Sequence, residues 1–241
     1  MWLYAIIYWI AIKNSSGSDI LKLSYYIKRL IPVLLYGIFY LACFFYLEHR
    51  NVRSYYIIHT KIDELIPFCE YFIIPYVMWF FYIFITVAYF LLQKDNSAEY
   101  YRLIFSLGLG MTVFLLISWI FPNGQDLRPL EFPRDNIFTD MIRILYRGDT
   151  STNIFPSIHV FNSTACCLAV CTSEKLKRRK AVRWSISALT VLIILSTMFL
   201  KQHSVLDVIC ALALNYGAYA LFYRPHFASY RAKAVEKKRF L

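Results

Sequence analysis

The sequence predicts an all-α, polytopic membrane protein: a bundle of six transmembrane helices with a short N-terminal interfacial helix. Of its 241 residues, 59% are hydrophobic and 19% are aromatic, and the mean hydropathy is +0.48. A soluble domain of this length is more polar. About 20 apolar residues cross the hydrocarbon core of a bilayer, and the chain has six apolar stretches near that length.

The stretches that we predict to span the membrane are residues 30–47, 71–92, 103–121, 154–171, 184–200 and 204–223. The fourth is the most polar because it carries Ser157, His159 and Asn162. The opening stretch, Trp2 to Ile12, is too short to span the bilayer, so we expect an interfacial helix there rather than a signal peptide.

These stretches divide the chain into three parts. Residues 1–29 are a cytoplasmic or interfacial segment, residues 30–223 are the membrane domain, and residues 224–241 are a basic cytoplasmic tail.

The charge distribution predicts the orientation in the membrane. The net charge is +11, and if the loops alternate sides, most of the 26 Lys and Arg residues share the side of the N-terminus. Positive charge is retained in the cytoplasm, so both termini are expected there, in a multi-pass protein of the cell membrane. No nucleic-acid-binding fold or aromatic platform is visible, and the six cysteines show no zinc-type spacing. We therefore expect no nucleic-acid partner, metal or cofactor.

The loop of residues 122–153 is long enough to suggest a function. Ile137, Met141, Ile144 and Leu145 recur within it at helical spacing. They predict a short amphipathic helix on the membrane surface, capped by Asp135 or Asn136. The triplet Arg147-Gly148-Asp149 is too short to assign a role.

Two short strings carry the chemistry: Phe155 to His159, and Lys201 to Asp207. Each places a histidine at the end of an apolar stretch, and Asp207 follows His203 by four residues. On a helix this spacing puts both side chains on one face. A carboxylate there can hold the imidazole Nδ1–H and leave Nε2 basic, as in nucleophilic catalysis. An aspartate one turn inside a span is costly, which favours a functional role.

The predicted topology brings several polar residues to the outer membrane boundary. They are Arg128, Ser157, His159, Lys201, His203 and Asp207. A basic, hydroxyl and imidazole cluster suits a phosphate ester. The free N–H groups at the start of the fourth span, near Ser157 and Ile158, favour an anion, and Arg128 can bind phosphate oxygens in a bidentate way.

These residues resemble the type-2 phosphatidic acid phosphatase superfamily, which also includes vanadium haloperoxidases and bacterial lipid-phosphate phosphatases. The family pattern is K-x6-R-P, then P-S-G-H, then S-R-x5-H-x3-D. Here it reads Arg128-Pro129, Pro156-Ser157-Ile158-His159, and Ser196-Thr197 followed by His203 and Asp207.

Three positions depart from that pattern. Phe121 stands for the lysine, Ile158 for the glycine and Thr197 for the arginine, and Lys201 or Arg134 could replace one lost cation. With these departures the sequence is most similar to the branch that contains the inositol phosphorylceramide synthases and their bacterial relatives.

The resemblance implies a metal-independent mechanism. His203 would attack phosphorus and form a phosphohistidine, Asp207 would orient it, and His159 would protonate the leaving lipid oxygen. Arg128, Ser157 and nearby backbone N–H groups would hold the phosphate oxygens, as in an oxyanion hole.

We therefore expect a membrane enzyme that hydrolyses a lipid-linked phosphate on the extracytoplasmic face. The first alternative is a phosphotransferase that moves a phosphorylated head group between lipids; a polar acceptor pocket near Asp63, Glu64 and Glu70 would favour it. The second is a catalytically silent lipid-binding membrane protein, which the lost lysine and arginine favour. The lipid class, the oligomeric state and the choice between hydrolysis and transfer stay open.

Overall fold

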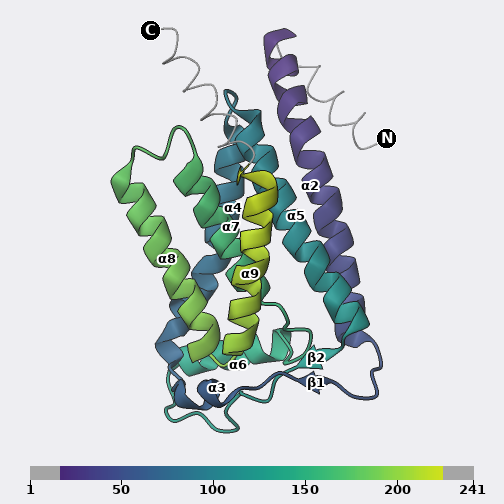
Figure 1. The fold of residues 1–241 in the computed structure, drawn as a ribbon, viewed down its shortest axis with the longest axis vertical. Coiled ribbons are helices and arrows are strands. Elements are labelled where there is room, and N and C mark those ends of the chain that lie inside the picture. Colours follow the sequence, from purple (N-terminus) through teal and green to yellow (C-terminus); the bar gives the residue numbers. More distant parts are fainter. Residues whose placement is uncertain (1–16, 225–241) are drawn as a thin grey trace.

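The computed structural model describes residues 17–224, which form a bundle of α-helices with one small sheet at its end (Figure 1). In chain order the elements are α2 (Gly17–His49), β1 (Tyr56–Ile57), α3 (Lys61–Leu65), the 3₁₀ helix η1 (Glu70–Phe72), α4 (Ile73–Leu92), α5 (Ser97–Ile120), β2 (Asn123–Gly124), α6 (Ile137–Gly148), α7 (Ile158–Thr172), α8 (Lys180–Phe199) and α9 (Val205–Phe222). The predicted interfacial helix at Trp2–Ile12 and the basic tail lie outside the described residues.

Within residues 17–224, five helices are long and apolar enough to cross a membrane: α2, α4, α5, α8 and α9. The sixth predicted span is α7, which has only 15 residues, fewer than the ~17 needed to span alone. It starts at Ile158 because the Ser157 side chain caps it, accepting a hydrogen bond from Val160 N–H. The all-α, membrane-like class is thus confirmed, whereas six full spans stay a prediction.

Helix α7 is the central helix of the bundle, packed against α4, α5, α8 and α9. Its Phe161 is 1% exposed and lies directly over Gly110 of α5. A Cβ at Gly110 would come within 2.0 Å of the Phe161 ring, so only glycine allows these two helices to approach so closely. This packing fixes the height at which α7 begins, and with it the position of His159.

One end of the bundle is covered by α3, α6 and the two short strands (Figure 1). Strands β1 and β2 pair in parallel, Tyr56 with Asn123 and Ile57 with Gly124. The amphipathic helix predicted in the long loop is confirmed as α6, and its cap is Asn136, which accepts hydrogen bonds from Phe138 N–H and Thr139 N–H.

At the opposite end of the bundle, a buried arginine caps the C-terminus of α4. Arg29 of α2 is 3% exposed and donates hydrogen bonds to the carbonyls of Leu91 (3.0 Å) and Gln93 (2.9 Å). Its guanidinium lies 4.1 Å from the centre of the Tyr100 ring. The last carbonyls of a helix have no partner within the helix, so this side chain supplies the donors that α4 lacks.

Near the histidines, a buried aspartate accepts hydrogen bonds from the start of a helix. The Asp63 carboxylate, 3% exposed, accepts hydrogen bonds from Ser204 Oγ (2.7 Å), Val205 N–H (2.8 Å) and the N–H and hydroxyl of Thr60 (2.7 and 2.8 Å). Burial alone would raise the pKa of Asp63, but these hydrogen bonds outweigh it and hold the pKa below its usual value. Asp63 therefore joins α3 to the start of α9.

We expect Arg29→Ala to lower the free energy of unfolding by about 3 kcal/mol, because it removes charged hydrogen bonds and leaves buried carbonyls unpaired. Thermal unfolding of the purified protein in detergent measures this loss. Lys28→Ala is the control, since Lys28 is the exposed neighbour on the same helix. Equal melting temperatures for the two variants would contradict the role given to Arg29.

We expect Asp63→Asn to destabilise the fold by about 2 kcal/mol near neutral pH, because the amide nitrogen cannot accept a hydrogen bond. The folded pKa of Asp63 lies below the unfolded value of about 3.9. The contribution is therefore present above pH ~4 and is lost as the pH falls through the folded pKa. Melting curves across pH should show the two proteins converging in acid, whereas Asp135→Asn, an exposed change at the same end, should match the wild type throughout.

Candidate active site

His203 lies in the tight turn between α8 and α9. The carbonyl of Thr197 accepts hydrogen bonds from Gln202 N–H (2.9 Å) and His203 N–H (3.0 Å), which folds the turn back on the end of α8. Lys201 takes a left-handed backbone conformation there, with φ of 53°, which a non-glycine residue adopts only at a cost. The turn is thus held in one shape, and the His203 side chain is 8% exposed.

Asp207, in the first turn of α9, is the partner of His203. Its Oδ2 lies 3.3 Å from His203 Nδ1 and accepts a hydrogen bond from Ser204 N–H at 2.9 Å. The carboxylate is fully buried, and its Oδ1 has no hydrogen-bond partner. With Nδ1 turned toward the carboxylate, Nε2 of His203 is the nitrogen left to react.

His159 faces this pair from the first turn of α7. Its ring centre is 5.7 Å from that of His203, 4.7 Å from Tyr76 and 4.4 Å from Trp79. Its Nδ1 is buried without a hydrogen-bond partner. Both imidazoles line the same pocket.

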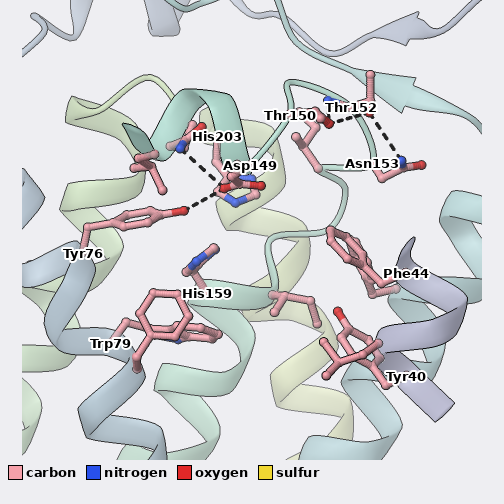
Figure 2. A pocket seen from close by; sticks show the side chains of 18 residues that line it. Tyr40, Phe44, Tyr76, Trp79, Asp149, Thr150, Thr152, Asn153, His159 and His203 are labelled. Carbon is pink, nitrogen blue, oxygen red and sulfur yellow. Dashed lines mark hydrogen bonds between the residues drawn. The ribbon is translucent and has the colours of Figure 1, made fainter. Parts of the chain in front are cut away.

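Both histidines line a pocket of about 300 Å³, at the low end of the range for small-molecule sites. In Figure 2, polar loop residues lie at one end, aromatic side chains at the other, and His159 between them. The polar side chains that we single out are Asp149, Thr150, Thr152, Asn153 and Gln202; the aromatic ones are Tyr40, Phe44, Tyr76, Trp79, Phe80 and Phe114.

Ser157 and Ile158, predicted to bind phosphate, are at the start of α7. Ser157 is fully buried; its N–H donates to the carbonyl of Asp207 at 3.4 Å, and its side chain caps the helix. Ile158 lines the pocket. The structure therefore brings the beginnings of α7 and α9 together around the two histidines.

Arg128 is held behind the pocket wall. It donates hydrogen bonds to the carbonyls of Tyr146 (3.2 Å), Asp149 (2.8 Å) and Thr150 (2.8 Å), and to Oε1 of Gln202. Its guanidinium lies 4.3 Å from the centre of the Tyr146 ring. In this arrangement Arg128 fastens the loop that carries Asp149 and does not line the pocket.

The other two predicted cations also lie away from the pocket. Lys201 Nζ donates to the carbonyls of Asp63 (2.6 Å) and Ile66 (2.5 Å), and burial lowers its pKa. The Arg134 side chain is 63% exposed and lies 3.5 Å from Glu70. Lys201 therefore braces the α3 segment, and Arg134 pairs with a carboxylate near η1.

Sequence reasoning missed four residues of the pocket: Tyr76, Trp79, Asp149 and Gln202. The Asp149 carboxylate accepts hydrogen bonds from Tyr76 OH (3.1 Å) and Gln202 Nε2 (3.5 Å). Only one signal pointed there, the position of Gln202 next to His203. Across residues 17–224, no group of three or more His, Cys, Asp or Glu is arranged to hold a metal ion.

One of the comparisons with known proteins gave a match, and the match covers this region of the chain. Neither the curated proteins nor the solved structures gave a match. The family model described as the PAP2 superfamily matches residues 124–231, which include His159, His203 and Asp207. Over its second half, the chain is thus similar to a superfamily of lipid phosphatases and phosphotransferases.

Proposed function

We propose that the protein is a membrane enzyme that cleaves a lipid-linked phosphate ester through a phosphohistidine on His203. The observation that carries the proposal is the pair of facing histidines in one pocket, one of them held by a buried carboxylate. The pocket is lined by apolar and aromatic side chains on α2, α4 and α5. A lipid tail can remain among such side chains while its phosphate reaches the histidines.

The reaction takes place in two steps. Nε2 of His203 attacks phosphorus, an N–P bond forms, and the P–O bond to the lipid breaks. His159 donates a proton to the departing lipid oxygen. His159 then removes a proton from water, whose oxygen attacks phosphorus and releases His203. Asp207 orients the His203 ring and stabilises its positive charge throughout.

The start of α7 is the best candidate for holding the phosphate oxygens. The first N–H groups of a helix have no partner within it and attract anions, and the first turn of α7 begins at Ile158, in the pocket wall. Arg128, Lys201 and Arg134 would each have to leave their present partners to reach a phosphate. We therefore assign Arg128 and Lys201 to positioning the site.

Hydrolysis remains the first choice of reaction. Asp63 and Glu70 are buried in contacts with other residues, and the exposed Glu64 contacts His59. None of these three acidic residues lines the pocket, so they do not form the acceptor pocket that would favour transfer to a lipid alcohol. A silent lipid-binding protein would not need a buried carboxylate behind a second histidine.

The orientation follows the positive-inside rule. The basic stretch Lys175–Arg183 joins α7 to α8 at the end of the bundle opposite the histidines (Figure 1). We propose that this end faces the cytoplasm and that the pocket opens on the extracytoplasmic face of the cell membrane.

We expect the purified protein in EDTA to release phosphate or a phosphorylated head group from membrane lipids. His203→Ala should lower kcat/KM at least about 1,000-fold, because it removes the nucleophile, and Asp207→Asn about 100-fold to 10,000-fold, because it misorients the ring. His59→Asn is the control, since His59 lies on the outer loop and is absent from the pocket wall.

His159→Asn should slow hydrolysis of the phosphohistidine more than its formation when the substrate has an acidic leaving alcohol. Such an alcohol leaves without protonation, whereas the attacking water still needs a base. We expect a phosphoprotein that is stable in alkali and labile in acid, as measured with labelled lipid, and we expect none with His203→Ala. Turnover without any labelled protein would reject the phosphohistidine, and no turnover of any lipid would reject the enzyme itself.

A further inference from the structure

The head-group end of the pocket has an unusual charge for a phosphate site. Its acidic and imidazole side chains are Asp149, His159 and His203, and none of the lining residues in the described chain is Lys or Arg. The Asp149 carboxylate is bound by two neutral donors, Tyr76 OH and the Gln202 amide. The Asp149 carboxylate thus forms no ion pair with the other described residues of the wall, and Arg128 acts on it only from behind the loop.

Two cations near that space donate their hydrogen bonds to backbone carbonyls. Arg128 donates its hydrogen bonds to three backbone carbonyls and to the Gln202 side chain behind the loop. Arg50 donates to the carbonyls of Ser118 and Trp119. A second carboxylate stands at the same end, because Glu48 of α2 accepts hydrogen bonds from Thr150, Thr152 and Asn153.

This distribution disfavours a phosphate monoester as the substrate. A monoester carries nearly two negative charges at neutral pH, and a charge is costly to bring into a site of low dielectric unless it is paired. A phosphodiester carries one negative charge, and an ammonium group on its head neutralises it. Such a head group enters with no net charge and offers Asp149 a cation.

Tyr76 supplies the second feature that a cation requires, because it places an aromatic residue of the pocket wall in direct contact with Asp149. Tyr40, Phe44 and Phe114 form a cluster with ring centres 6.1–6.5 Å apart, and all three line the pocket. Figure 2 shows Tyr40 and Phe44 across the pocket from Trp79, and Asp149 among the loop residues beyond His159, so we leave the Tyr40, Phe44 and Phe114 cluster to the lipid tail. Aromatic faces attract ammonium groups, and most strongly where water is excluded.

We propose that the substrate is a phospholipid whose head group carries a positively charged amine, with the ammonium beside Asp149 and the phosphate between His159 and His203. The inference rests on the proposed function and adds the substrate class. The bond that breaks joins phosphorus to the lipid oxygen, so the products are a diacyl or similar lipid alcohol and a phosphorylated amino alcohol. Choline and ethanolamine head groups share the chemistry that the pocket recognises.

The test compares donors that differ only in the head group. The full chain, purified in detergent, is given phosphatidylcholine, phosphatidylethanolamine, phosphatidylglycerol and phosphatidic acid with identical acyl chains, and the released phosphate compounds are measured. For the wild type we expect kcat/KM to be at least tenfold higher for choline or ethanolamine donors than for the glycerol donor or the monoester. The first two lipids show whether a quaternary or a primary amine fits better.

Asp149→Asn should lower the ratio of kcat/KM for the amine donors over the glycerol donor at least tenfold. Asp140→Asn makes the same chemical change on the exposed side of α6, where Asp140 pairs with Arg143, and should keep the wild-type ratio. A preference of the wild type for phosphatidic acid or phosphatidylglycerol would overturn the inference, and so would an equal loss on all donors. Either result would leave the phosphohistidine chemistry intact.

If no lipid is turned over, the proposed function is rejected. A binding measurement still tests the head-group site in that case. Phosphocholine and glycerol phosphate are added separately to the wild type and to Asp149→Asn, and the melting temperature is recorded. We expect phosphocholine to stabilise the wild type more than glycerol phosphate does, and this difference to vanish in Asp149→Asn. Equal shifts for both compounds in the wild type would refute a cationic head-group site.

Discussion

The Asp63 carboxylate fixes the start of α9, and the geometry of the site depends on it. Its oxygens bind Ser204 Oγ and Val205 N–H, the residues that flank the beginning of that helix. His203 precedes this point and Asp207 follows it within one turn, so their 3.3 Å contact requires that the helix begin there. The first N–H groups of a helix have no partner within the helix, and the buried Asp63 carboxylate supplies one for α9.

Three buried or half-buried cations among the described residues hold segments of backbone together. Arg29 donates hydrogen bonds to carbonyls at the end of α4, Arg128 to carbonyls of the loop after α6, and Lys201 to carbonyls of the α3 segment. A cation that donates to several carbonyls is held in a fixed position, so it can support a site without contacting the bound phosphate. The pocket keeps a carboxylate and two imidazoles, and this separation of roles underlies its expected preference among head groups.

Much of the fold and part of the site could be predicted from local patterns. Hydrophobic length identified the five long helices, helical spacing identified α6, and the four-residue interval put His203 and Asp207 together. Asp149 was noted only within the triplet Arg147-Gly148-Asp149 and given no role, because its contacts, Tyr76 and Gln202, are 73 and 53 residues away. The fastening role of Arg128 was hidden for a related reason: its acceptors are mostly backbone carbonyls, which every residue carries.

The N-terminal part of helix α2 extends beyond the end of α4. It has 33 residues, a length of about 50 Å, whereas a hydrocarbon core is about 30 Å thick. Arg29 marks the height at which α4 ends, and the part of α2 before it rises about 18 Å further (Figure 1). The candidate span within α2, Leu23–His49, has 27 residues and is about 40 Å long, so it exceeds the hydrocarbon core and fits a bilayer only by tilting or by leaving its ends in the interface.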